Sequence, residues 1–293
     1  MNHTLFDSFF QNRARSFLLE SIDQALKEDG RDLTSEGLFT QDDRLKARIV
    51  AKEEAVVAGL PIIALVFERL GVLKETVVDC LVKDGSSVAS GTELARIDGP
   101  AAAVLKAERV VLNFLCHLCG IATLTRRYAA LLENTKTRLL DTRKTLPGLR
   151  YPEKYAVRLG GGFNHRITLE EMLMLKDNHV DRMGGIRVAV ERLRSRYSPC
   201  PPIEVECRTL EHVQEAVQSR ADRIMLDNMN DDDIVQALGV IPETIETEVS
   251  GNVTMDSIRR IALLGPDYIS VGRITHSAPS VDLSLQYITP PNE

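Results

Sequence analysis

The 293-residue sequence predicts an α/β protein, and two observations support this class. From Leu139 onward, short apolar runs alternate with stretches of helical periodicity. The runs also recur at even spacing: 21 residues separate Glu206 from Asp227, 23 separate Asp227 from Ser250, and 22 separate Ser250 from Gly272. Each interval has room for one strand and one helix. That pattern indicates a (β/α) barrel or an open doubly wound sheet.

The elements before this region predict a mixed α+β unit. We expect a helix over residues 6–26, strands over 48–58 and 77–83, and a long helix over 102–132. Segment 82–91 is rich in Gly and Ser, which predicts turns between the short strands of a small antiparallel sheet. Gly120 predicts an interruption of the long helix.

The later elements follow in strict alternation. Strands are predicted over 139–142, 172–176, 203–206, 224–227, 245–250 and 268–272, with helices over 186–197, 210–219 and 255–264. The strand segments are almost wholly apolar, which is typical of parallel strands covered on both faces.

The composition restricts the class of protein. The formal net charge is −6, Trp is absent and no basic stripe with interleaved aromatic residues is present, so nucleic-acid binding is disfavoured. Five scattered cysteines argue against a secreted disulfide framework. The first 13 residues are too polar for a signal peptide, and the longest apolar run, residues 60–67, is too short to span a bilayer. We expect a cytoplasmic, soluble protein.

Polar or small residues end six of the predicted strands. These residues are Thr142, Lys176, Glu206, Asp227, Ser250 and Gly272. The carboxyl ends of barrel strands meet at one mouth, where such proteins hold their catalytic groups. Six such residues in register therefore favour a site at the mouth over strand ends that are polar only because they leave the core.

Cations gather in the segment from Asp141 to His179, against the negative background of the chain. Arg143 and Lys144 follow a strand end, and Arg166 follows the triple glycine Gly160–Gly162. A guanidinium matches both oxygens of a carboxylate, so Arg143, Arg166 and Arg109 are candidates for carboxylate recognition. The triple glycine itself lacks the spacing of a phosphate loop and is consistent with a turn.

Acidic and phosphate-binding candidates occupy the other strand ends. The carboxylates of Glu206 and Asp227 should face one mouth, where they suit Mg²⁺ or ribose hydroxyls. Ser250-Gly251-Asn252 and Val271-Gly272-Arg273 follow the last two strands, where backbone N–H groups commonly bind phosphate in barrels. Cys116-His117-Leu118-Cys119 has metal-ligand spacing, but it lies in a predicted helix without a second ligand pair, which favours helix packing.

Taken together, these motifs resemble the quinolinate phosphoribosyltransferase family nearly end to end. The most specific blocks are Asp141 to Gly148, with the sequence DTRKTLPG, and Asn164-His165-Arg166. Further matches are Ala107-Glu108-Arg109, Lys176-Asp177-Asn178-His179, Glu204-Val205-Glu206, Met225 to Asn228, Val249 to Thr254 and Ser270-Val271-Gly272.

The resemblance implies an incompletely closed (β/α) barrel with an N-terminal α/β sandwich domain. The sandwich would comprise residues 1–115, completed by 276–293, and the barrel residues 116–275. It also implies a homodimer in which Arg109 reaches the site of the neighbouring subunit, with a hexamer as a further assembly. The reaction would transfer phosphoribosyl from phosphoribosyl pyrophosphate (PRPP) to quinolinate with decarboxylation, giving nicotinate mononucleotide, pyrophosphate and CO₂ in de novo NAD biosynthesis.

The resemblance also implies roles for individual residues. Quinolinate would be held by Arg109, Thr142, Arg143, His165, Arg166 and Lys176; PRPP and Mg²⁺ would be held by Lys144, Glu206, Asp227, Ser250, Gly251, Asn252, Val271, Gly272 and Arg273. Glu206 and Asp227 would bind Mg²⁺ partly through water and PRPP. Lys144, Lys176, Glu206 and Asp227 would be catalytic. The family usually has a small residue in place of Arg273, so this arginine would add a phosphate contact.

Two alternatives remain open at this stage. One is a phosphoribosyltransferase of the same fold that acts on nicotinate or another monocarboxylate, although His165-Arg166 with Arg109 supplies a second cationic clamp that one carboxylate does not need. The other is a non-catalytic barrel that binds a phosphorylated metabolite, which would not require both Lys144 and the Glu206/Asp227 pair.

Overall fold

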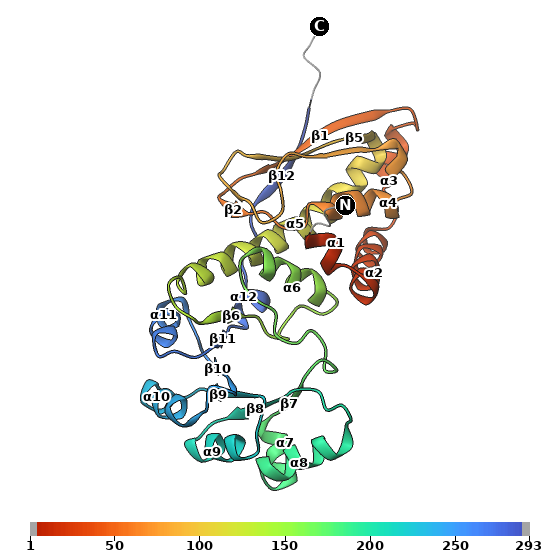
Figure 1. The fold of residues 1–293 in the computed structure, drawn as a ribbon. Helices are drawn as coiled ribbons and strands as arrows, with labels where there is room; N and C mark the ends of the chain where they lie inside the picture. The colour runs from red at the N-terminus through yellow and green to blue at the C-terminus, as the bar shows by residue number, and fades with distance from the viewer. Residues whose placement is uncertain (1–4, 289–293) are drawn as a thin grey trace. The chain divides into compact units, whose positions relative to one another are not determined.

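A computed structural model describes residues 5–288 of the chain (Figure 1). These residues divide into two compact units. Unit 1 contains the chain up to residue 126, residues 145–161, and the chain from residue 274 onward; unit 2 contains residues 127–144 and 162–273. The division therefore passes through one long helix and returns segment 145–161 to unit 1, whereas the sequence-based boundary was set between residues 115 and 116.

Unit 1 combines helices with small antiparallel sheets. Its helices are α1 (Leu5–Phe9), α2 (Asn12–Asp29), α3 (Leu33–Leu38), α4 (Pro61–Arg69), the 3-10 turn η1 (Leu73–Glu75), α5 (Ala101–Ala130, which continues into unit 2) and α6 (Arg150–Leu159). Its strands are β1 (Arg44–Ala51), β2 (Ala55–Val56), β3 (Val77–Cys80), β4 (Ser87–Val88), β5 (Glu93–Pro100) and β12 (Leu283–Tyr287). Among the described residues, one sheet has the antiparallel order β12-β1-β5-β3, and β2 pairs with β4 in a second.

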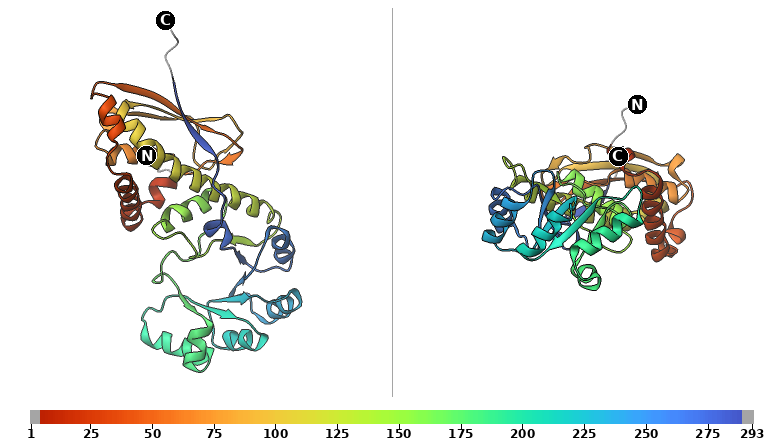
Figure 2. Two further views of the ribbon diagram at one scale, coloured as in Figure 1. Left: turned by 180° about the vertical axis from the view of Figure 1, so that it is seen from behind. Right: turned by 60° about the horizontal axis from the view of Figure 1, so that its bottom comes forward.

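The predicted helix over 6–26 forms as two helices, α1 and α2, and the turn-rich segment 82–91 forms turns around β4, as expected. The apolar run 60–67 begins helix α4, whose first helical residue is Pro61, a position where the missing N–H costs nothing. Seen from behind, β12 (blue) lies along the N-terminal sheet, where Tyr287 pairs with Ala47 of β1 (Figure 2).

Helix α5 runs without interruption through Gly120, so the predicted break there was wrong. The glycine serves packing instead: a Cβ at this position would lie 2.1 Å from the carbonyl oxygen of Pro279. By length and composition α5 could cross a membrane, but 61% of its most apolar window is buried within the protein. That burial is typical of a core helix.

Unit 2 alternates strands and helices. Its strands are β6 (Arg138–Leu140), β7 (Leu173–Leu175), β8 (Ile203–Cys207), β9 (Arg223–Asp227), β10 (Glu246–Ser250) and β11 (Tyr268–Ser270). Its helices are α7 (Asp177–Met183), α8 (Ile186–Arg196), α9 (Leu210–Gln218), α10 (Asp231–Val240) and α11 (Met255–Leu263), and α12 (Arg273–His276) begins at its last residue. All six predicted strands and the three predicted helices are present, each within a few residues of its expected bounds.

Within the described residues, the six strands of unit 2 form one parallel sheet in the order β6-β11-β10-β9-β8-β7. Helices α8 to α11 lie around its outer side (Figure 1). Phe163 extends the sheet by a single parallel bridge to Leu140 beside β6, but no ladder joins it to β7. The sheet is therefore curved but not closed, which confirms the expected α/β fold with an incompletely closed barrel.

Side-chain caps start several helices immediately after the strand ends. Thr209 accepts a hydrogen bond from His212 N–H at the start of α9, and Asn230 accepts one from Asp233 N–H at the start of α10. Thr254 and Ser257 form a reciprocal capping box at α11. These caps keep the strand-to-helix turns short, which holds the carboxyl ends of the strands in one fixed rim.

Candidate active site

A cavity of about 450 Å³ opens at the carboxyl ends of the strands of unit 2. Its walls come from β7 to β11 and from the segments that follow β6 and Phe163. The lining residues are Thr142, Arg143, Lys144, His165, Arg166, Met174, Lys176, Glu206, Met225, Asp227, Asn228, Glu248, Ser250 and Ser270. Residues separated by more than 120 positions in the sequence therefore share one space.

Most of the predicted site residues meet in this cavity. Thr142, Arg143, Lys144, His165, Arg166, Lys176, Glu206, Asp227 and Ser250 line it, while Gly251 and Asn252 line an adjoining cavity of about 400 Å³ together with Ser250. Val271, Gly272 and Arg273 are absent from the lining residues of both cavities; Val271 is buried and Arg273 is exposed at the start of α12. Arg109 belongs to unit 1, where it is exposed on α5.

The acidic side of the cavity lies on two neighbouring strands. Glu206 is the penultimate residue of β8, opposite Met225 of β9, and Asp227 ends β9 opposite Ser250 of β10. Burial raises the pKa of Glu206, and the charge of Asp227 raises it further. A divalent cation between the two carboxylates would relieve this repulsion, and carboxylate oxygens are the donors that Mg²⁺ prefers. This pair therefore fits a magnesium site.

Arg208 adds a cation that sequence reasoning missed. Its guanidinium lies 2.8 Å from Asp177, 3.4 Å from Glu206 and 3.5 Å from Asp227, although about half of its side chain is exposed. Among the causes that lower the pKa of Asp177, the backbone N–H of Asn178 is the largest, and Arg208 adds to it. The only sequence signal was an arginine one residue past a strand.

The turn after β10 is shaped by its neighbour on β9. Gly251 has a φ of +97°, and a Cβ there would lie 2.3 Å from the side-chain oxygen of Asn228. That oxygen accepts a hydrogen bond from Asn252 Nδ2 at 3.0 Å, while Asn228 Nδ2 donates to Asp227 at 3.0 Å. The predicted tripeptide 250–252 is therefore tied directly to the acidic pair.

The basic side of the cavity is built from residues that follow β6 and from the 163–166 segment. Arg166 Nη1 donates to the carbonyl of Met172 at 2.7 Å, which anchors its side chain. Burial lowers the pKa of Arg166, and the charge of Arg143, which lines the same cavity, lowers it further. Lys144 and Lys176 line the same space. An anion entering the cavity would meet four cations.

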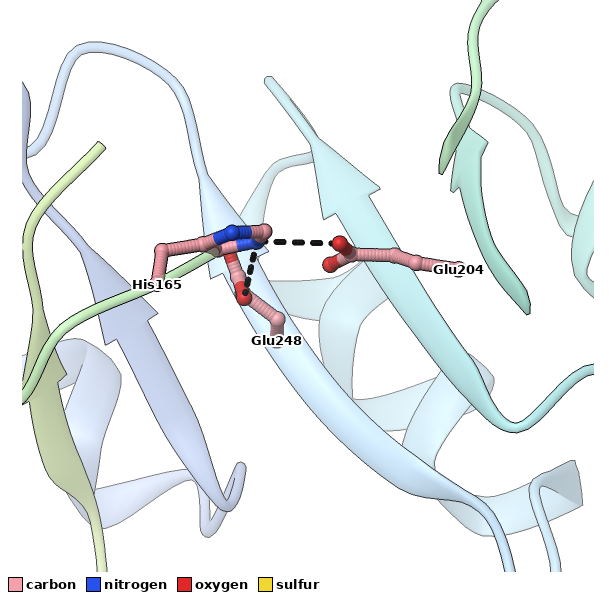
Figure 3. A group of neighbouring side chains, drawn as sticks. All are labelled: His165, Glu204 and Glu248. Atoms are coloured by element: carbon pink, nitrogen blue, oxygen red, sulfur yellow. Dashed lines mark ion pairs between the residues drawn. The ribbon is translucent and has the colours of Figure 1, made fainter. Parts of the chain in front are cut away.

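A buried group of His165, Glu204 and Glu248 adjoins these cations (Figure 3). His165 Nε2 lies 2.9 Å from Glu204 Oε2 and 3.5 Å from Glu248 Oε2, and both glutamates are 0% exposed. Burial raises the pKa of Glu204 to about 7 and, together with the charge of Glu204, that of Glu248 to about 8. Strand alternation was the missed signal, because positions 204 and 206, like 248 and 250, point to the same face.

Two motifs of the sequence serve packing in unit 1. Gly160 ends α6, and a Cβ there would lie 2.6 Å from the carbonyl oxygen of Ala122 on α5. Cys119 is buried in α5, and His117 Nε2 lies 2.9 Å from Glu153 Oε1 of α6. The preference for helix packing over a metal site at residues 116–119 is therefore consistent with the contacts observed there.

Family models match almost the whole chain. The model described as quinolinate phosphoribosyl transferase, N-terminal domain, matches residues 32–119, and the corresponding C-terminal domain model matches residues 121–286. A probable nicotinate-nucleotide pyrophosphorylase [carboxylating] of Bacillus subtilis (strain 168) is 43% identical over 263 residues, covering 89% of each chain. The protein of that name from Synechocystis is 43% identical over 272 residues, covering 91% of each.

Solved structures agree with these sequence relatives. The nicotinate-nucleotide pyrophosphorylase from Francisella tularensis superposes with a TM-score of 0.88 at 36% identity, covering 96% of this chain and 99% of that one. The enzyme of that name from Ehrlichia chaffeensis gives a TM-score of 0.86 at 36% identity, covering 92% and 98%.

Proposed function

The chain belongs to the quinolinate phosphoribosyltransferase family, and from this membership we propose that the cavity of unit 2 is its catalytic site. The reaction transfers the phosphoribosyl group of PRPP to quinolinate with loss of CO₂, giving nicotinate mononucleotide and pyrophosphate in NAD biosynthesis. One observation carries the proposal: four cations and a strand-end carboxylate pair line one cavity of about 450 Å³. A dianionic acceptor and a metal-bound pyrophosphate need those two kinds of surface side by side.

The basic side of the cavity suits quinolinate. Arg143 and Arg166 would bind the two adjacent carboxylates, with Thr142 and Lys176 beside them, since guanidinium groups recognise carboxylates in a bidentate manner. Arg109 of the partner subunit would complete the clamp in a homodimer. A monocarboxylate such as nicotinate would leave part of this charge unmatched, which disfavours that alternative.

The acidic side suits PRPP and Mg²⁺. Glu206 and Asp227 would hold the ion, partly through water, and Mg²⁺ would supply charge neutralisation for the departing pyrophosphate. Ser250, Gly251 and Asn252 would bind phosphate through the turn after β10, and Lys144 would pair with a phosphate oxygen. Val271, Gly272 and Arg273 are the remaining phosphate candidates at the end of β11.

The chemistry follows from this division of charge. The pyridine nitrogen of quinolinate attacks the anomeric carbon of ribose as the bond to the pyrophosphate oxygen breaks, and Glu206 or Asp227 stabilises the positive charge that develops there. The nitrogen becomes cationic. The bond from C2 to its carboxylate then breaks, CO₂ leaves, and the electron pair stays on C2. Lys144 and Lys176 stabilise that pair and are the candidates to protonate it.

Product analysis tests the proposal. We expect equimolar pyrophosphate and CO₂ from quinolinate plus PRPP, with release dependent on Mg²⁺. Pyrophosphate from nicotinate without CO₂ would identify the monocarboxylate enzyme, and binding without turnover would identify a non-catalytic barrel. Arg143→Ala should weaken quinolinate binding about 10- to 100-fold and PRPP binding much less, as measured by calorimetry.

Subunit complementation tests the shared site. Arg109→Ala and Glu206→Gln variants should each be nearly inactive alone, and mixing them should restore part of the activity because hybrid dimers contain one intact site. A mixture that stays inactive would contradict a contribution of Arg109 across the interface. A hexamer would appear in sedimentation as a further species. We propose a cytoplasmic location, which cell fractionation tests; the rice relative, by contrast, is named chloroplastic.

A further inference from the structure

The backbone around Arg166 is held by side chains at the open side of the barrel, where no ladder within the described residues joins it to β7. The N–H of His165 donates to Asp141 at 2.8 Å, and the N–H of Arg166 donates to His165 Nδ1 at 2.8 Å. The N–H of Ile167 donates to Glu171 Oε2 at 2.6 Å. Three successive backbone donors are therefore held by three side chains, and two of the acceptors are carboxylates.

The bond from Ile167 to Glu171 closes a turn that returns the chain to Arg166. Residues 167–172 form neither helix nor strand, so side-chain contacts give this turn its shape. The residue after Glu171 is Met172, whose carbonyl accepts a hydrogen bond from Arg166 Nη1 at 2.7 Å. Closure of the turn therefore brings the backbone acceptor of the guanidinium to its position.

The guanidinium of Arg166 requires this support because a second cation, Arg143, lines the same cavity. Burial, and then the charge of Arg143, lowers the pKa of Arg166, whereas the charges of Glu204 and Glu171 raise it. Glu204 is buried on β8, and Glu171 is exposed. Solvent screens the charge of an exposed carboxylate, so the larger contribution of Glu171 is its hydrogen bond within the turn.

We propose that Glu171 is a positioning residue for Arg166 and thereby sets the affinity for the substrate's carboxylates. Its carboxylate accepts the Ile167 N–H, the closed turn presents the Met172 carbonyl, and the guanidinium of Arg166 is held where it lines the catalytic cavity. Glu171 is not among the residues that line that cavity, so it acts on the substrate through Arg166. The inference rests on the proposed function.

Two substitutions of Glu171 test the hydrogen bond. Glu171→Gln keeps an oxygen that accepts the Ile167 N–H and removes the charge, whereas Glu171→Ala removes the acceptor. Glu171→Ala should raise the KM for quinolinate about five- to tenfold, the worth of one hydrogen bond to a charged acceptor, and Glu171→Gln about twofold at most. The kcat and the KM for PRPP should stay within about twofold, because only quinolinate binding is weakened. Glu191→Ala, at an exposed position of α8, is the matched control.

Equal losses in Glu171→Gln and Glu171→Ala would show that the charge acts and the hydrogen bond does not, which would overturn the proposal. A double-mutant cycle then separates positioning from general damage. In protein that carries Arg166→Ala, adding Glu171→Ala should lower kcat/KM for quinolinate by less than about twofold, because the side chain to be positioned is gone. An undiminished effect in that background would also overturn the proposal.

Turnover of the wild-type protein is measured first, and its absence would refute the proposed function. The order of the variants is then tested by calorimetry with phthalate, which carries two adjacent carboxylates. Amide exchange in the unsubstituted, ¹⁵N-labelled protein covers the case in which a variant does not fold. We expect the Ile167 amide to exchange at least about tenfold more slowly than in an unstructured peptide. An unprotected Ile167 amide would overturn the proposal.

Discussion

His117 in unit 1 and His165 in unit 2 each place Nε2 2.9 Å from the carboxylate of a fully buried glutamate, yet their surroundings differ. In unit 1 the single carboxylate of Glu153 also accepts the backbone N–H of Leu146, so the pair joins α5, α6 and the segment before α6. In unit 2 a second carboxylate lies 3.5 Å from the ring, and the histidine is fixed to the backbone of an arginine.

The cavities beside the two histidines differ in the same way. The cavity beside His117, of about 550 Å³, has described lining residues that include Glu20 and Glu28 but neither lysine nor arginine. The cavity at His165 has four cations. The distance between a histidine and a glutamate is therefore a poor guide to function. Two features distinguish the pair in unit 2, which adjoins the proposed catalytic cavity, from the pair in unit 1. They are the cations that line the cavity and the hydrogen bond that His165 Nδ1 accepts from the backbone of Arg166.

The largest expected effect comes from removing a charge at the cavity of unit 2. Glu206→Gln should lower kcat about 100- to 1,000-fold, because one preorganised group that stabilises the transition state is lost, with Tm within about 2 °C of the parent protein. Glu20→Gln, which changes the same charge at the cavity of unit 1, is the matched control and should leave kcat unchanged. A comparable loss in both variants would contradict the contrast between the two cavities.

The next effect concerns stability. His117→Ala leaves the buried carboxylate of Glu153 without its histidine, and we expect a loss of about 2–3 kcal/mol in the free energy of unfolding. Urea unfolding measures this loss, and activity per folded molecule should stay within about twofold. His212→Ala, at a partly exposed position of α9, provides a control. A tenfold fall in kcat at unchanged stability would instead give His117 a part in the reaction.

Unit 2 should contribute a pH dependence of stability. The pKa of Glu248 is raised to about 8, first by burial and then by the charge of Glu204. The folded state binds this proton more tightly than the unfolded chain, so the stability it contributes is fully present below about pH 4.5 and is lost as the pH rises toward 8. We expect wild-type stability to fall by about 3–4 kcal/mol between pH 5 and pH 8.

Glu248→Gln cannot ionise and should lack that part of the slope. Thermal unfolding at several pH values compares the two proteins. Parallel curves would show that Glu248 does not hold the proton in the folded state.

The smallest effect concerns Arg208, which lies between the carboxylates that fit the metal. Arg208→Gln removes a competing cation from a half-exposed position, so the affinity for Mn²⁺ should increase about threefold, as measured by electron paramagnetic resonance. Asp227→Asn should weaken Mn²⁺ binding and so verifies that the signal comes from this site. Weaker binding in Arg208→Gln would mean that the arginine helps to hold the metal complex.

The strand-helix alternation of unit 2 was predictable because parallel strands covered on both faces are continuous apolar runs, and the even spacing from Glu206 to Gly272 leaves room for one helix between successive strands there. The residues at strand ends followed from the same argument. Helix α10 was not predicted, although five apolar residues follow the three aspartates of its first turn: Ile234, Val235, Ala237, Leu238 and Val240. The predicted helix break at Gly120 was wrong because this glycine makes room for the backbone of Pro279. That contact joins residues far apart in the sequence and could not be predicted from the local pattern.

The site was only partly predictable for a related reason. Glu204 and Glu248 share a face with Glu206 and Ser250 by strand alternation, but their meeting with His165 depends on which strands are neighbours and on where the segment after Phe163 returns. The position of Arg208 in the site could not be predicted, because it depends on a side-chain conformation that brings its guanidinium to carboxylates on three elements. The roles of the individual site residues and of Mg²⁺ stay predictions until the experiments above are done.

In each unit the first strand along the chain pairs with the last. β1 pairs with β12 in unit 1, and β6 pairs with β11 in unit 2. When only the N-terminal half of the chain has been synthesised, each of these sheets therefore still lacks a strand. Residues 283–287 must emerge before β1 gains its second partner. During synthesis β1 therefore keeps one unpaired edge until almost the whole chain has emerged, and an unpaired strand edge is a site where other chains can pair.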